Sequence, residues 1–137
     1  MTTLLEIRGL NTYYGESHIL RNVDLTVQAG EMVCLIGRNG VGKTTLLKSL
    51  IGLLHPKVGE VLFNGDSVNR YAPHRRARAG IGYVPQGREI IPQLTVEENL
   101  MLGMEALPGG MAKNRRIDPF VYELSLIHIS EPTRPLY

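Results

Sequence analysis

The sequence predicts a mixed α/β domain built around a phosphate-binding loop. Residues 37–44 read Gly-Arg-Asn-Gly-Val-Gly-Lys-Thr, which is the complete pattern G-x-x-x-x-G-K-[ST]. A short apolar run, 31–36, precedes the loop, and leucines at helical spacing follow it. A strand, a glycine-rich loop and a helix in this order form the anion-binding unit of a sheet with helices on its faces.

Each residue type in the loop has a physical task. Glycines let the backbone wrap closely around an anion, so that successive N–H groups point inward. The ammonium group of Lys43 reaches the outer phosphates, and the hydroxyl of Thr44 can bind Mg²⁺. The predicted phosphate-binding residues are Gly37, Arg38, Asn39, Gly40, Val41, Gly42, Lys43, Thr44 and Thr45.

The elements beside the loop are predicted from their apolar patterns. Residues 31–36 predict a strand that is buried on both faces of a parallel sheet, with Cys34 as a small buried apolar residue. Residues 44–54 predict a helix that Pro56 ends. Its predicted apolar face consists of Leu46, Leu47, Leu50, Leu53 and Leu54.

The remaining elements follow from alternation and turn signals. Residues 4–10, 18–27 and 59–64 predict strands, with a turn over 11–17 and an Asn-Gly turn after the third strand. Residues 73–79 predict a basic helix, and 80–85 predict a short apolar strand. Thr95 and Glu98 have the spacing of a capping box that opens a helix reaching about Met104, and 108–110 interrupt it.

Other polar and aromatic residues are candidates for the site. The ring of Tyr14 could stack on a base, or Tyr13 or Tyr14 could pack against the sheet, and spacing alone leaves both open. The amide of Gln86 follows a predicted strand and could contact Mg²⁺, or it could be a polar loop residue. The basic cluster is predicted to be a solvated helix face. It comprises His74, Arg75, Arg76 and Arg78.

Composition limits the class of protein. The 137 residues are 43% hydrophobic and 20% charged, which suits one globular core, and the net charge of +2 is too small to predict a nucleic-acid partner. The sequence contains neither an apolar run of membrane-spanning length nor a secretory pattern at its N-terminus. A single cysteine cannot form an internal disulfide, which together with the loop indicates the reducing cytoplasm.

Residues 1–123 resemble the N-terminal part of an ABC transporter ATP-binding subunit. The resemblance rests on Tyr14-Gly15, Gly30-Glu31, the loop with its leucine-rich helix, and Tyr83-Val-Pro-Gln86. It implies a P-loop NTPase fold of the ABC ATPase type: an antiparallel β subdomain, part of a parallel core sheet and the start of a helical subdomain. It implies that Tyr14 stacks on the adenine of ATP, and that Gln86 senses the γ-phosphate through Mg²⁺ and water.

The amino-acid sequences of several segments resemble those of urea-importer ATPases and their branched-chain amino acid relatives. These segments are 13–15, 37–43, 73–89 and 94–100. The resemblance implies a second ATP-binding subunit in a head-to-tail dimer, transmembrane permease subunits and, indirectly, a periplasmic solute-binding protein. It also implies a peripheral position on the cytoplasmic face of the inner or plasma membrane.

Parts that such an ATPase needs for turnover are absent from this sequence. These are the Leu-Ser-Gly-Gly-Gln signature, an apolar strand ending in Asp, the Glu that polarises water and a downstream His. No catalytic residue is therefore assigned, and we expect nucleotide binding with negligible turnover. Residues 124–137 resemble an in-frame translation of a sequencing adapter, so we expect a truncated reading frame with a non-native tail.

Two functions from different classes follow from these observations. One is a fragment of an importer ATPase, for urea first and branched-chain amino acids second. The other is a nucleotide-binding module without catalysis. A truncated parallel sheet would leave the apolar faces of Val33, Leu35 and Val84 without neighbours, so we expect the isolated chain to be marginally stable or to aggregate.

Overall fold

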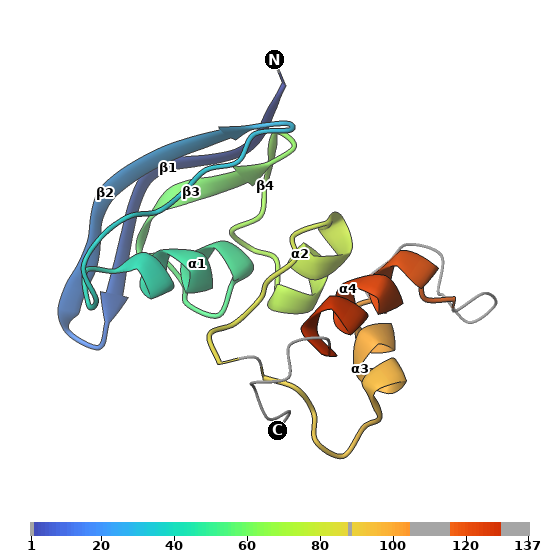
Figure 1. The fold of residues 1–137 in the computed structure, drawn as a ribbon. Helices are drawn as coiled ribbons and strands as arrows, with labels where there is room; N and C mark the ends of the chain where they lie inside the picture. Colours follow the sequence, from blue (N-terminus) through green and yellow to red (C-terminus); the bar gives the residue numbers. More distant parts are fainter. Residues whose placement is uncertain (1, 88, 105–115, 130–137) are drawn as a thin grey trace. The chain divides into compact units, whose positions relative to one another are not determined.

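A computed structural model describes residues 2–87, 89–104 and 116–129 (Figure 1). The chain divides into two compact units, residues 1–83 and residues 84–137. In the described residues, no helix is both long and apolar enough to span a bilayer.

The first unit contains a four-stranded antiparallel sheet in the order β2-β1-β3-β4. Its strands are β1 (Thr3–Tyr14), β2 (Ser17–Gln28), β3 (Val58–Phe63) and β4 (Asp66–Ser67). In the centre of the sheet, Ile7 pairs with Leu25 on one side and with Val61 on the other. The strands predicted over 4–10, 18–27 and 59–64, and the Asn64-Gly65 turn, are confirmed.

The turn predicted over 11–17 was too long. The first strand continues to Tyr14, and only Gly15 and Glu16 form the turn before β2. Register shifts occur between Ile7 and Leu10 and again near Thr12, so simple alternation ends there. Because of these shifts, Ile7, Leu10 and Thr12 are all buried although two of them are an odd number of residues apart.

The first helix, α1 (Lys43–Ile51), lies across one face of this sheet (Figure 1). Its buried leucines, Leu46 and Leu50, join a core that also includes residues of β1, β2 and β3. The helix ends earlier than predicted, because Gly52 adopts a left-handed conformation (φ 85°) and its N–H donates to the carbonyl of Lys48. Leu47 and Leu53, which we predicted on the apolar face, are exposed.

Two segments that we predicted as buried strands are not strands. Residues 31–36 and 80–85 have no regular secondary structure, and Met32 and Ile36 are 97% and 92% exposed. Cys34 is exposed too, so its predicted burial was wrong. An apolar run becomes a buried strand only where neighbouring strands supply ladder partners, and every pairing among the described residues is antiparallel and involves β1–β4.

The second helix, α2 (Pro73–Ala79), has the predicted bounds, with a proline in its first turn and Gly80 as its C-cap. The second unit contains α3 (Val96–Leu102) and α4 (Pro119–Ile129). The predicted capping box is present: Glu98 N–H donates to Thr95 Oγ1 at 3.2 Å, and Thr95 N–H donates to Glu98 Oε2 at 2.7 Å. The break predicted over 108–110 lies outside the described residues.

Candidate phosphate-binding site

The loop between residues 37 and 42 is held against strand β2. Gly42 has a φ of 106°, and a Cβ there would lie 3.0 Å from Leu20 Cδ2 and 3.1 Å from Ile19 Cγ2. Gly40 also has a positive φ of 80°. A residue with a side chain would therefore be strained at position 42 and would push the loop away from the sheet.

The first turn of α1 suits an anion. Gly42 is the N-cap of α1. Within this described helix, no side chain accepts a hydrogen bond from the N-terminal amides, and no acidic residue lies in the first turn. The unpaired N–H groups at a helix N-terminus carry partial positive charge. The sequence thus leaves this end of α1 without an internal competitor for a phosphate group.

Lys43 supplies the positive charge of the loop. It is the first residue of α1, and its Nζ donates to the carbonyl oxygen of Gly37, so the side chain reaches back over the loop. Thr44 is exposed, as are Arg38, Asn39 and Val41, whereas Thr45 is half-buried. The ammonium group of Lys43 therefore lies close to the backbone of the predicted loop.

A pair of buried hydroxyls fixes α1 to strand β1 of the sheet. Ser49 Oγ donates to the Thr45 carbonyl at 2.7 Å and lies 3.1 Å from Thr12 Oγ1. Ser49 has one hydroxyl proton, so Thr12 must be the donor of the second bond. Both side chains are fully buried. The Thr12–Ser49 bond therefore fixes the last turn of α1 to β1, and the Ser49–Thr45 bond lies within the helix.

Tyr13 and Tyr14, the aromatic pair before the turn, have different surroundings. Tyr13 stacks on His18 with ring centroids 4.2 Å apart, and Lys57 Nζ lies 4.3 Å from the centroid of the same ring. Tyr14 is 63% exposed at the end of β1. Of the two alternatives left open by the sequence, packing therefore applies to Tyr13, and the ring of Tyr14 remains accessible.

Gln86 belongs to the second unit, whereas Tyr14 and the loop belong to the first. Its side chain is exposed in a turn formed with Gly87, which has a φ of 92°. The strand predicted before it is absent, as described above. In the described residues, no group of three or more His, Cys, Asp or Glu could hold a metal ion. The assignment of Thr44 and Gln86 as magnesium ligands stays a prediction.

The second unit carries an apolar cavity of about 670 Å³ beside α3. Isoleucines and a proline of the 89–94 segment line one part, and Val96, Leu100 and Leu102 of α3 line the other. Asn99 holds this segment to the helix: its Oδ1 accepts from Ile91 N–H, and its Nδ2 lies within 3.2 Å of the carbonyls of Ile91, Leu94 and Thr95. One amide side chain therefore joins the two parts of the cavity lining.

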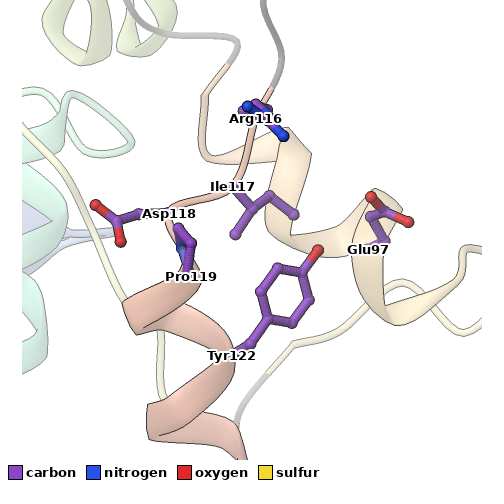
Figure 2. A pocket seen from close by; sticks show the side chains of 6 residues that line it. All are labelled: Glu97, Arg116, Ile117, Asp118, Pro119 and Tyr122. Atoms are coloured by element: carbon purple, nitrogen blue, oxygen red, sulfur yellow. The ribbon is translucent and has the colours of Figure 1, made fainter.

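A second cavity, of about 510 Å³, lies between α3 and the start of α4 (Figure 2). Figure 2 shows the ring of Tyr122 directed between Ile117 and Glu97. Its charged lining residues are Glu97, Arg116 and Asp118, so carboxylates outnumber cations. This balance does not suit a polyphosphate.

Sequence reasoning missed the role of Arg76. We predicted a solvated basic face, and His74, Arg75 and Arg78 are indeed exposed, but Arg76 is only 1% exposed. Apart from Pro73 in its first turn, the only apolar residues of the helix carrying it are two alanines. This lack of large apolar side chains could have indicated a buried arginine, because a helix that packs against a core must bury some of its side chains. Thr12 and Ser49 were missed as well, since neither residue forms a motif.

The fold and the loop define a P-loop protein of the α/β class. The chain belongs to the ABC transporter family, whose family model matches residues 20–135.

The chain is 40% identical to the probable branched-chain amino acid transport ATP-binding protein LivF of Archaeoglobus fulgidus, over 82% of this chain and 48% of LivF. It is 34% identical to the lipopolysaccharide export system ATP-binding protein LptB of Haemophilus influenzae, over 94% of this chain and 54% of LptB.

Solved structures agree with this assignment. An ATP-binding subunit of an ABC transporter has a TM-score of 0.76 and 36% identity, over 92% of this chain and 52% of that one. The dimeric ATP-binding cassette MJ0796, in a post-hydrolysis state bound to ADP and Pi, has a TM-score of 0.68 and 30% identity, over 80% and 51% of the two chains. The chain thus spans about half the length of each of these four proteins.

Proposed function

We propose that this chain is the N-terminal part of an ATP-binding subunit that powers an ABC importer, and that it binds MgATP. The observation that carries the proposal is the uncapped N-terminus of α1, with Lys43 folded over the loop that precedes it. Such an arrangement receives the phosphates of a nucleotide. The ADP and Pi named for the MJ0796 cassette support the same ligand class.

In this proposal the loop from Gly37 to Thr45 holds the phosphates. Lys43 turns its ammonium group from the Gly37 carbonyl to the outer phosphates, and the exposed hydroxyl of Thr44 binds Mg²⁺ together with Gln86. A bound Mg²⁺ neutralises charge on the phosphate oxygens. Tyr14, exposed at the end of β1, stacks on the adenine ring.

The partners in the proposal are a second ATP-binding subunit, transmembrane permease subunits and an indirect periplasmic solute-binding protein, with the chain on the cytoplasmic face of the membrane. The dimeric state of the MJ0796 cassette supports the first partner. The apolar cavity beside α3 supports contact with a permease, because exposed apolar hollows mark interaction surfaces.

Urea is our first proposed solute, with branched-chain amino acids as the second candidate. The proposal of urea rests on the sequences of residues 37–43 and 73–80, and the second candidate is supported by the name of LivF. Uptake of labelled urea and labelled leucine, measured in cells with and without the intact gene, separates the two. Loss of leucine uptake alone would exclude urea.

The nucleotide proposal is tested by calorimetric titration of the 137-residue chain with ATP, with and without Mg²⁺. We expect magnesium-dependent binding that Lys43→Ala abolishes, with Lys48→Ala, in the last turn of the same helix, as the matched control. Turnover is measured separately. Because the signature and the water-polarising Glu are absent from the sequence, we expect binding with negligible hydrolysis, and Lys43-dependent turnover would contradict this.

The domain boundary belongs to the same proposal. We propose that residues 1–123 are native and that 124–137 are a read-through tail. Helix α4 runs across this junction, from Pro119 to Ile129. Sequencing the uninterrupted coding region decides the matter: an identical continuation after Glu123 would show that the tail is natural.

A further inference from the structure

Arg76 is a buried cation whose hydrogen bonds all go to backbone carbonyls. Its Nη1 donates to Ser49 O at 2.9 Å and to Leu50 O at 2.7 Å. Its Nε and Nη2 donate to Tyr71 O at 3.0 Å and Asn69 O at 3.3 Å. Burial lowers the pKa of this guanidinium from its ordinary value. The one ion pair found in the described residues joins Arg8 and Glu6, so no carboxylate of that part of the chain balances Arg76.

Two of these carbonyls are the ones that α1 leaves unpaired at its C-terminus. The N–H groups of Gly52, Leu53 and Leu54 all donate to the carbonyl of Lys48. Ser49 and Leu50 lie in this last turn of the helix, and none of these three N–H groups donates to their carbonyls. The guanidinium fork supplies the missing donors, and it also places positive charge at the negative end of the helix dipole.

Gly52 makes room for this arrangement. A Cβ at Gly52 would lie 2.9 Å from Arg76 Nε and 3.1 Å from Arg76 Cζ. The left-handed φ of 85° at the same residue turns the chain away after the helix. The C-terminus of α1 thus leaves space for the Arg76 side chain.

The other end of α1 is the phosphate-binding loop. The helix has nine residues, so it is about 13 Å long. Near the loop it is held by the buried side chain of Leu46. At its far end it is held by Arg76 and by the Thr12–Ser49 bond, because Ser49 lies in the last turn. Loss of Arg76 removes the donors that hold the last carbonyls of α1, so we expect the axis of the helix to shift and its free N–H groups to move with it.

We propose that Arg76 is a positioning residue for the phosphate site. By binding the last carbonyls of α1 it fixes the axis of the helix whose first turn faces the phosphates. This inference rests on the proposed nucleotide binding. It assigns a function to a buried arginine that touches neither the loop nor any nucleotide-binding residue.

The test compares Arg76→Met, Arg76→Lys and the control Arg78→Met, an exposed arginine in the same helix, in the 137-residue chain. The first readout is the amide chemical shifts of Gly37, Gly40 and Gly42 without nucleotide. We expect them to move in Arg76→Met and to stay in place in Arg78→Met. This readout needs no ATP, so it stands even if the wild-type chain fails to bind nucleotide.

The second readout is affinity for MgATP and for magnesium pyrophosphate, at a temperature where circular dichroism shows each variant folded. We expect Arg76→Met to weaken both by a similar factor of about tenfold or more, since the effect falls on the phosphate site alone. Arg76→Lys should recover part of the loss, because an ammonium group satisfies some of the carbonyls.

A folded Arg76→Met chain with unchanged glycine shifts and unchanged affinities would overturn the inference. If Arg76→Met does not fold, Arg76→Lys decides. Faster amide exchange at Leu53 and Leu54 with unmoved loop glycines would then show a purely structural arginine. If the wild-type chain does not bind MgATP, that result would instead count against the proposed function.

Discussion

Thr12 Oγ1 and Ser49 Oγ lie 3.1 Å apart in the interior, and together they connect β1, an inner strand of the sheet, to helix α1. The serine hydroxyl is also 2.7 Å from the Thr45 carbonyl, in the first turn of α1. Each hydroxyl is fully buried, so water cannot replace either partner. The pair therefore fixes the last turn of the helix that follows the phosphate-binding loop.

Ser49→Ala should destabilise the first unit by about 1–3 kcal/mol, because Thr12 is left as a buried hydroxyl without a partner. Urea unfolding followed by circular dichroism measures the change. Thr12→Val is the companion variant, since Ser49 then keeps its bond to Thr45. The double variant should cost less than the two single changes added together, and strict additivity would show that the two hydroxyls do not interact.

Tyr14→Ala should weaken MgATP binding by about 1–3 kcal/mol, the usual contribution of one aromatic ring stacked on a base. Calorimetric titration is the measurement. Tyr14→Phe is the control, because it keeps the ring and removes only the hydroxyl, and it should bind like the wild-type chain. Equal affinity of the alanine variant would exclude Tyr14 from the base site.

The capping box at the start of α3 should weaken in acid. Hydrogen bonds from the backbone N–H and then from the side chain of Thr95 lower the pKa of Glu98 below its usual 4.5. A lowered folded pKa means that the contribution to stability is complete above the usual value and is lost as pH falls through the folded pKa. The amide proton shift of Thr95, followed by NMR, should therefore titrate with a midpoint below 4.5.

Two variants make this titration specific. Glu98→Gln keeps the hydrogen bond to Thr95 N–H and should remove the acid transition from that amide. Glu97→Gln changes the neighbouring first-turn acid and should leave the midpoint of the Thr95 amide in place. A midpoint of 4.5 or above in the wild-type chain would show that the capping box does not form in solution.

The apolar segment before the loop should drive self-association. Met32 and Ile36 are almost fully exposed, and they lie in a stretch of apolar residues. We expect light scattering to detect oligomers of the wild-type chain and a larger monomer fraction in the Met32→Lys/Ile36→Lys variant. Val58→Lys, at an exposed valine on β3, is the matched control and should leave the oligomers unchanged. A monomeric wild-type chain with a cooperative thermal transition would contradict the expected self-association.

Local signals predicted the elements that local forces determine. The Asn64-Gly65 turn, the capping box of Thr95 and Glu98, and the bounds of α2 all follow from residues within one turn of each other. The loop was recognised for the same reason, since its pattern is contiguous. The burial of 31–36 was predicted wrongly because it depends on neighbouring strands that the pattern cannot supply.

The anchoring of α1 could not be predicted from the sequence. Arg76 binds carbonyls of residues 26 and 27 positions away, and backbone acceptors carry no side-chain signature. Thr12 and Ser49 are 37 positions apart and belong to no motif. Long-range polar contacts of this kind become visible only when the chain is folded.

The exposed thiol of Cys34 has a practical consequence. It is the only cysteine in the chain and lies three residues before Gly37. A maleimide fluorophore or nitroxide would attach there, at a single known position, without any mutation. Its emission or its spectral line shape would then follow ordering of the adjacent backbone in real time as a ligand is added.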